Sequence, residues 1–184
     1  MRRLRLAALL LVVSAGASAI EPSLRPGGVA IVDVGDAANA APRARLDGKP
    51  LMTLLRGDRW VAVVGIPLST DPGELAIHIG DNTQRVDVLA HAYREQRLTV
   101  ENKGFVNQNE EQLDRIFAER RIIDAVLTSF TDRPVDDVAL VPPVPGPRSP
   151  SFGYRRFFND QPRSPHSGMD IAAPAGTPVV AARD

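Results

Sequence analysis

The sequence contains no cysteine, so the fold can rely neither on disulfides nor on a thiolate metal site. Any metal site must therefore use nitrogen and oxygen ligands. Aromatic residues make up only 5% of the chain, lysine occurs only at Lys49 and Lys103, and the formal net charge is zero. A nucleic-acid-binding protein would need a basic patch, which this composition does not indicate, so we expect no nucleic-acid partner.

Apolar residues are present in ordinary amount. They make up 43% of the 184 residues, which is enough for a packed core and excludes a wholly disordered chain. The length allows one ordinary domain, or one small domain followed by part of another. The 16 prolines cluster late in the chain, which indicates a linker there.

The N-terminus, residues 1–19, has the features of a signal peptide. Arg2, Arg3 and Arg5 form a basic start, residues 6–13 form an apolar core, and Ala-Ser-Ala then gives a small-residue cleavage pattern. The apolar run is short for a bilayer span, so we expect cleavage, with retention as an anchor as the alternative. The sequence therefore predicts a periplasmic or secreted protein with no stable membrane span after cleavage.

Residues 20–108 predict a β-rich domain. Leu75, Ile77 and Ile79 alternate with other residues, as in a half-buried strand, and Arg-Gly-Asp at residues 56–58 is a turn signal. Several short strands at regular spacing suggest a small antiparallel sandwich or barrel. The predicted strands are residues 29–34, 51–55, 60–66, 75–79 and 86–88, and the pattern extends to Leu98 and Val100.

Residues 109–131 predict the one helix. Asn109 is a suitable N-cap, and Gln112 occupies the reciprocal position of a capping box. One face of the helix is apolar, and we expect it to pack on the chain's own domain, with a partner helix as the alternative. The residues of this face are Leu113, Ile116, Phe117, Ile123, Leu127 and Phe130.

Residues 132–150 predict a proline-rich linker that acts as a semi-rigid spacer. The segment that follows, residues 151–184, has few large apolar side chains, and ordering it would cost about 1–2 kcal/mol per residue in backbone entropy. We therefore expect proteolysis to remove this tail and leave a resistant core of residues 26–130. Resistance of the tail would instead mean that it docks on the N-terminal unit.

The most specific stretch of the sequence lies in this tail. Phe-Gly-x-Arg-Arg begins at Phe152, Pro-His-Ser-Gly-x-Asp-Ile-Ala begins at Pro165, and Gly-Thr-Pro-Val begins at Gly176. The second motif places His166 four residues before Asp170, and an imidazole nitrogen with a carboxylate oxygen suits zinc. The pair alone is weak evidence, and a surface loop without metal is the alternative, but the three motifs together are far more specific.

These motifs resemble the opening of the catalytic domain of the LytM/lysostaphin-type zinc metallopeptidases, which cut the peptide part of bacterial peptidoglycan. The resemblance implies that His166 and Asp170 are two of three protein ligands of Zn²⁺. In the family, the third ligand and a neighbouring His that orients a water come from a downstream His-x-His, and no His follows His166 here. We therefore expect no catalytic residue within the chain, and an inactive fragment.

The fold class that follows is mainly β. We expect a small antiparallel β-sandwich-like N-terminal domain with one helix, then the linker, then the first strands of an incomplete antiparallel β catalytic domain. Two other classes of function remain open. One is a degenerate LytM-type protein that activates a cell-wall amidase, and the other is a secreted β-sandwich binding module.

The resemblance also implies peptidoglycan stem peptides as the binding partner. Arg155 and Arg156 are candidates to contact the stem-peptide carboxylates, and Asn159 is a similar, weaker candidate. A structural contact is the alternative for each of them. His78 and His91 have no pattern of partners around them, so we expect both to be solvated surface residues outside the zinc site.

Overall fold

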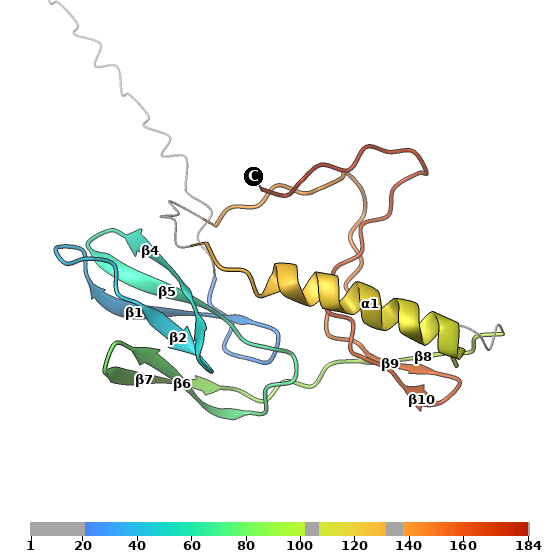
Figure 1. Cartoon of the computed structure of the whole chain (residues 1–184), viewed down its shortest axis with the longest axis horizontal. Coiled ribbons are helices and arrows are strands. Elements are labelled where there is room, and N and C mark those ends of the chain that lie inside the picture. The colour runs from blue at the N-terminus through green and yellow to red at the C-terminus, as the bar shows by residue number, and fades with distance from the viewer. Residues whose placement is uncertain (1–20, 102–106, 132–137, 184) are drawn as a thin grey trace, which may run out of the picture.

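A computed structural model describes residues 21–101, 107–131 and 138–183 (Figure 1). The predicted signal peptide lies outside these ranges. Among the described residues, no helix has the length and hydropathy needed to cross a membrane. The elements are β1 (Val29–Asp36), β2 (Ala44–Leu46), β3 (Lys49–Pro50), β4 (Met52–Arg56), β5 (Arg59–Gly65), β6 (Gly73–Ile79), β7 (Asn82–Val88), β8 (Glu95–Leu98), α1 (Glu110–Leu127), β9 (Arg155–Phe158) and β10 (Gln161–Pro162).

Two antiparallel sheets build the N-terminal half, with strand orders β1-β5-β4 and β3-β2-β6-β7. The predicted turn before β5 is present, and Gly57 adopts φ 62° there, a conformation that glycine tolerates best. Alternate residues of the strands face inward and form one apolar cluster, which confirms the mainly β, sandwich-like prediction. This cluster contains Ala30, Val32, Val34, Ala44, Leu46, Ala62, Val64, Ile66, Ile77 and Val88.

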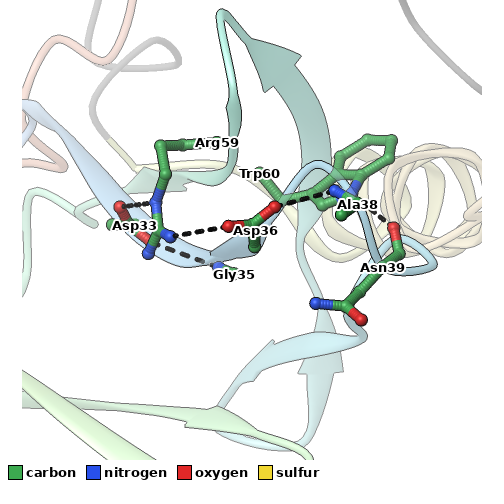
Figure 2. Close-up of polar contacts among 7 residues, drawn as sticks. All are labelled: Asp33, Gly35, Asp36, Ala38, Asn39, Arg59 and Trp60. Carbon is green, nitrogen blue, oxygen red and sulfur yellow. Dashed lines mark hydrogen bonds and ion pairs between the residues drawn. The ribbon is translucent and has the colours of Figure 1, made fainter.

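A β-bulge interrupts β1 between Asp33 and Gly35, and Figure 2 shows the polar contacts around it. Arg59 on β5 donates to both carboxylate oxygens of Asp33, with Nε–Oδ2 at 2.7 Å and Nη2–Oδ1 at 2.6 Å. Hydrogen bonding from Arg59 lowers the pKa of the Asp33 carboxyl, and the Gly35 N–H donates to the same carboxylate at 3.2 Å. Because the Asp33 and Arg59 side chains are exposed, their ion pair adds little stability. Its position at the bulge indicates that it helps to fix the bend of β1.

Helix α1 begins where the sequence predicts. The Asn109 side chain accepts a hydrogen bond from the Gln112 N–H at 2.9 Å, and the Gln112 side chain accepts one from the Asn109 N–H at 3.0 Å. The expected packing of its apolar face is wrong for the described part of the chain, where no residue of α1 is buried and Phe117 is 59% exposed. An amphipathic pattern marks a face that can be covered, but it does not show that the same chain covers it.

The third sheet crosses the predicted domain boundary, with strand order β10-β9-β8. Strand β8 runs parallel to β9, so that Glu95 pairs with Arg155 and Leu98 with Phe158 (Figure 1). The sequence pattern assigned Leu98 to the N-terminal strands, and this assignment is wrong because the partner strand lies in the tail. A parallel pair needs a long crossover connection, and the chain from β8 to β9, which includes α1, supplies it.

The described part of the proline-rich segment, residues 138–150, is not a separate spacer. Backbone hydrogen bonds join it to residues 170–182, because proline lacks an N–H but keeps a carbonyl that can accept. The described part of this segment therefore lies along the tail instead of holding the tail at a distance. The bonds run from Val141 N–H to Ala182 O (3.0 Å), Ser149 N–H to Asp170 O (2.9 Å), Ala172 N–H to Pro147 O (3.0 Å) and Val180 N–H to Pro143 O (2.9 Å).

Tyr93 joins the sandwich to the tail. Its hydroxyl donates to the Pro26 carbonyl at 2.7 Å, and its ring lies against Gly153, where a Cβ atom would be 2.1 Å from Cε1 of the tyrosine. Gly153 also has φ 81°. Both the lack of space for a Cβ atom and this backbone conformation therefore require glycine at this position. The Phe152 ring meets Tyr93 edge to face at 6.3 Å and lies beside Gly27. The tail therefore docks on the N-terminal unit.

Candidate metal centre

His166 lies in the extended segment after β10, and its backbone is held on both sides. The His166 N–H donates to the Tyr154 carbonyl at 3.0 Å, and the Gly153 N–H donates to the His166 carbonyl at 2.7 Å. These bonds attach His166 to the part of the tail that docks on Tyr93. Only 12% of the imidazole is exposed, so the ring has little freedom to turn.

Asp170 faces His166, as the spacing of the motif suggested. The His166 Nε2 atom is 3.3 Å from Asp170 Oδ2, yet this buried nitrogen makes no hydrogen bond to any described residue. Two donors at about 2.0 Å from a tetrahedral zinc ion would lie about 3.3 Å apart. The separation and the orphaned nitrogen both fit a shared metal ion. Their role as ligands stays a prediction.

Two serine hydroxyls lie behind the Asp170 carboxylate. Ser151 is 8% exposed, and its Oγ–H donates to Asp170 Oδ2 at 3.4 Å. Ser149 Oγ hydrogen bonds to Ser151 Oγ and also accepts from the Ser151 N–H at 3.2 Å. Groups in this position orient a ligating carboxylate. Neither serine could be singled out from the sequence, because their only signal is a pair of hydroxyls before Phe-Gly.

The other two histidines lie away from the pair. His78 is exposed on β6, as expected, with Nδ1 3.1 Å from Thr83 Oγ1. His91 is also exposed, as expected, and its ring packs edge to face on Tyr93 with centroids 4.5 Å apart. Within the described ranges, no group of three His, Cys, Asp or Glu residues could hold a metal ion.

Two of the candidate substrate residues have structural contacts. Arg156 Nε donates to Gln96 Oε1 at 3.1 Å, from β9 to β8. The Asn159 side chain accepts from the Val100 N–H at 2.8 Å and donates to the Val100 carbonyl at 3.0 Å. Asn159 also has φ 49°, which asparagine adopts more readily than most residues. These contacts fit the structural alternative for both residues.

Arg155 differs from Arg156 and Asn159 because it is among the residues that line a pocket. The pocket has a volume of about 330 Å³ and lies where loops of the sandwich meet the tail. His91, Tyr93 and Pro165 also line it. Since Pro165 immediately precedes His166, this pocket adjoins the candidate metal pair along the chain. Arg155 is therefore the one of the three candidates that lines this pocket.

Comparisons with known proteins show similarity to one family of peptidases. Residues 25–91 match the model of the peptidase family M23 N-terminal domain, a match that covers the sandwich. The crystal structure of a "putative peptidase M23" from Pseudomonas aeruginosa is 35% identical with a TM-score of 0.66, covering 87% of this chain and 60% of that chain. No curated protein matches the chain.

Both matches confirm the resemblance to the M23 peptidases, the family of the LytM-type enzymes. The chain spans 60% of the length of the matched crystal structure. The family model covers residues 25–91 and so lies on the sandwich rather than on the His166 segment. The family-model match is therefore independent of the motif around His166.

Proposed function

We propose that this chain is part of an exported zinc endopeptidase that hydrolyses peptide cross-links of bacterial peptidoglycan. The observation that carries the proposal is the buried His166 Nε2, which lies 3.3 Å from Asp170 Oδ2 without a hydrogen bond to any described residue. The similarity to M23 peptidases supports the reaction class. The presence of both His166 and Asp170 argues against a degenerate activator, since such a protein would have lost ligands.

The chain's own contribution is a positioned pair of ligands. A zinc ion held by His166 and Asp170 would supply a Lewis acid that polarises the scissile carbonyl and makes water more acidic. The backbone bonds of His166 hold the imidazole in place, and Ser151 orients the carboxylate of Asp170. In the family, the further ligand comes from a His-x-His motif, which this sequence does not contain.

Metal binding is tested by adding Zn²⁺ to isotope-labelled residues 20–184 and following the amide NMR spectrum. NMR detects weak binding, which is what a pair of protein ligands should give. We expect shifts centred on His166 and Asp170. His166→Ala should abolish them, and His78→Ala, which changes an exposed histidine of β6, should leave them intact. Shifts centred on another part of the chain, or unaltered in His166→Ala, would contradict the assignment.

Activity is tested separately. We expect residues 20–184 with added zinc to leave a peptidoglycan suspension turbid, because the family's His-x-His motif is not in this sequence. The measurement is the loss of turbidity together with analysis of released peptides. Clearing of the suspension by this chain, lost when a chelator is added, would show that the pair finds its remaining ligands elsewhere.

A further inference from the structure

Helix α1 exposes large apolar side chains along its whole length. Every residue from Glu110 to Leu127 is exposed, and no described part of the chain buries any of them. Exposed apolar patches of this kind mark interaction surfaces, and an isolated helix of this length is only marginally stable in water. The large apolar residues that α1 exposes are Leu113, Ile116, Phe117, Ile122, Ile123, Val126 and Leu127.

Four of these side chains follow the heptad spacing of a coiled coil. If Leu113 is taken as position a, then Leu127 is also at position a, and Ile116 and Ile123 are at position d. The a position in the middle is occupied by Arg120, so that successive positions are three and four residues apart throughout the helix. The partner that fits such a seam is a helix with the same spacing, and α1 of a second copy of the chain supplies one.

The charges of α1 favour one orientation of two such helices. Glu110, Glu111 and Asp114 make the start of the helix acidic, whereas residues 115–127 carry three Arg against one Glu and one Asp. Parallel helices would bring the acidic starts of both copies together, at the cost of repulsion between like charges. Antiparallel helices place each acidic start beside the positively charged part of the other copy and align the helix dipoles favourably.

We propose that the apolar face of α1 binds the same face of a second copy of this chain, as an antiparallel pair of helices. In the register that overlaps the two helices fully, Ile116 of one copy meets Leu127 of the other, and Arg120 meets Ile123. Arg120 Nε already pairs with Asp124 Oδ1 of its own helix at 3.0 Å, so its charge is partly balanced beside the seam. This association is independent of the zinc chemistry proposed above.

The pair of helices is weak. A helix of 18 residues is about 27 Å long, and two such helices bury an area near or below the roughly 1,200 Å² of a stable complex. Arg120 in the middle of the seam lowers the affinity further. We therefore expect a dissociation constant on the order of 0.1 mM. At low micromolar concentration the chain is monomeric, and dilute denaturation and proteolysis experiments then report on the uncovered helix.

Sedimentation equilibrium of residues 20–184 without zinc, from low micromolar concentration to about 1 mM, tests the association. Ile123→Glu should weaken it at least about tenfold, because it places a charge in the apolar seam. Ala118→Glu is the matched control, since Ala118 lies on the opposite side of the helix. Arg120→Leu should strengthen the association at least about tenfold by completing the seam, and it gives a second reading if Ile123→Glu fails to fold.

The absence of cysteine allows the orientation to be tested by disulfide trapping. Ile116→Cys and Leu127→Cys chains are mixed at high concentration with oxidised glutathione. We expect disulfides mainly between the two variants, because two copies of the same variant would hold their thiols about 16 Å apart along an antiparallel pair. Ala118→Cys mixed with Ala125→Cys is the control, since these residues lie at matching levels on the outer side of the helices and should not favour a mixed disulfide.

A chain that stays monomeric at every concentration would overturn the proposal and leave the apolar face of α1 to a different partner. Disulfides mainly within each variant would show a parallel pair and refute the antiparallel orientation. Equal effects of Ile123→Glu and Ala118→Glu would place the contact between copies elsewhere on the chain. Because zinc is absent from these experiments, none of these results bears on the candidate metal centre.

Discussion

The Nε2 atom of His166 is buried and makes no hydrogen bond to any described residue. Leaving a buried polar atom without a hydrogen bond costs on the order of 1–3 kcal/mol, and a bound ion is one way to satisfy it. Asp170 lies 3.3 Å away with a carboxylate that is 63% exposed, so the pair opens to solvent on one side. A metal ion could reach both donors from that side.

Ser151 should affect the affinity of this pair for metal without being a ligand. Ser151→Ala removes the hydroxyl that donates to Asp170 Oδ2, and the carboxylate then has more orientations to lose on binding. We expect about tenfold weaker zinc binding in the NMR titration, at the lower end of the effect of such contacts. Ser129→Ala is the matched control, because Ser129 Oγ donates only locally, to the Val126 carbonyl at the end of α1. Equal affinities for the two variants would remove Ser151 from the site.

The three motifs and the family resemblance predicted that His166 and Asp170 would face each other, but they could not reveal the residues around the pair. His166 and Asp170 are four positions apart, and the chain between them leaves few arrangements. The contact of Tyr93 with Gly153 joins positions far apart in the sequence, and no local pattern signals it. The pocket that His91, Tyr93 and Arg155 line therefore follows from tertiary packing alone.

At the scale of elements, the sequence predicts the features that depend on neighbouring residues, and it does not predict those that depend on distant residues. Alternation of apolar residues predicted β6, and the capping box predicted the start of α1, since both signals are local. The parallel pairing of β8 with β9 depends on a strand on the far side of the helix. The proline-rich segment was predicted to be a spacer because proline has no N–H to donate. The prediction overlooked the carbonyls of Pro143 and Pro147, which accept hydrogen bonds from the tail.

The core and the helix should respond differently to loss of an apolar side chain. Ile77 is fully buried in the sandwich, and Ile77→Ala should lower the free energy of unfolding by about 2–5 kcal/mol. Ile123 in α1 is 52% exposed, and Ile123→Ala should change the same quantity by less than about 0.5 kcal/mol. Urea denaturation followed by Trp60 fluorescence measures both. A comparable loss from Ile123→Ala would show that the apolar face of α1 is covered in solution.

At the scale of the whole molecule, the described parts form one unit rather than a core with a free tail. Three independent sets of contacts cross from the N-terminal half to the tail: the β8–β9 pairing, the packing of Tyr93 on Gly153, and the position of Phe152 beside Gly27. Backbone hydrogen bonds also join residues 138–150 to residues 170–182. The helix α1 lies in the connection between the two halves and contributes no buried side chain among the described residues.

Limited trypsin digestion should therefore cut within α1 before it removes the tail, because a helix without buried side chains opens locally at little cost and its arginines are exposed. We expect the two fragments to elute together in size-exclusion chromatography, held by β8 and β9. Gly153→Ala should release the C-terminal fragment, since a Cβ atom there would lie 2.1 Å from the ring of Tyr93. Early loss of the tail from the unmodified chain, leaving a core near residues 26–130, would instead support the independent tail expected from the sequence. That result would also argue against the pocket between the sandwich loops and the tail, because the tail supplies Gly153, Arg155 and Pro165 to its lining.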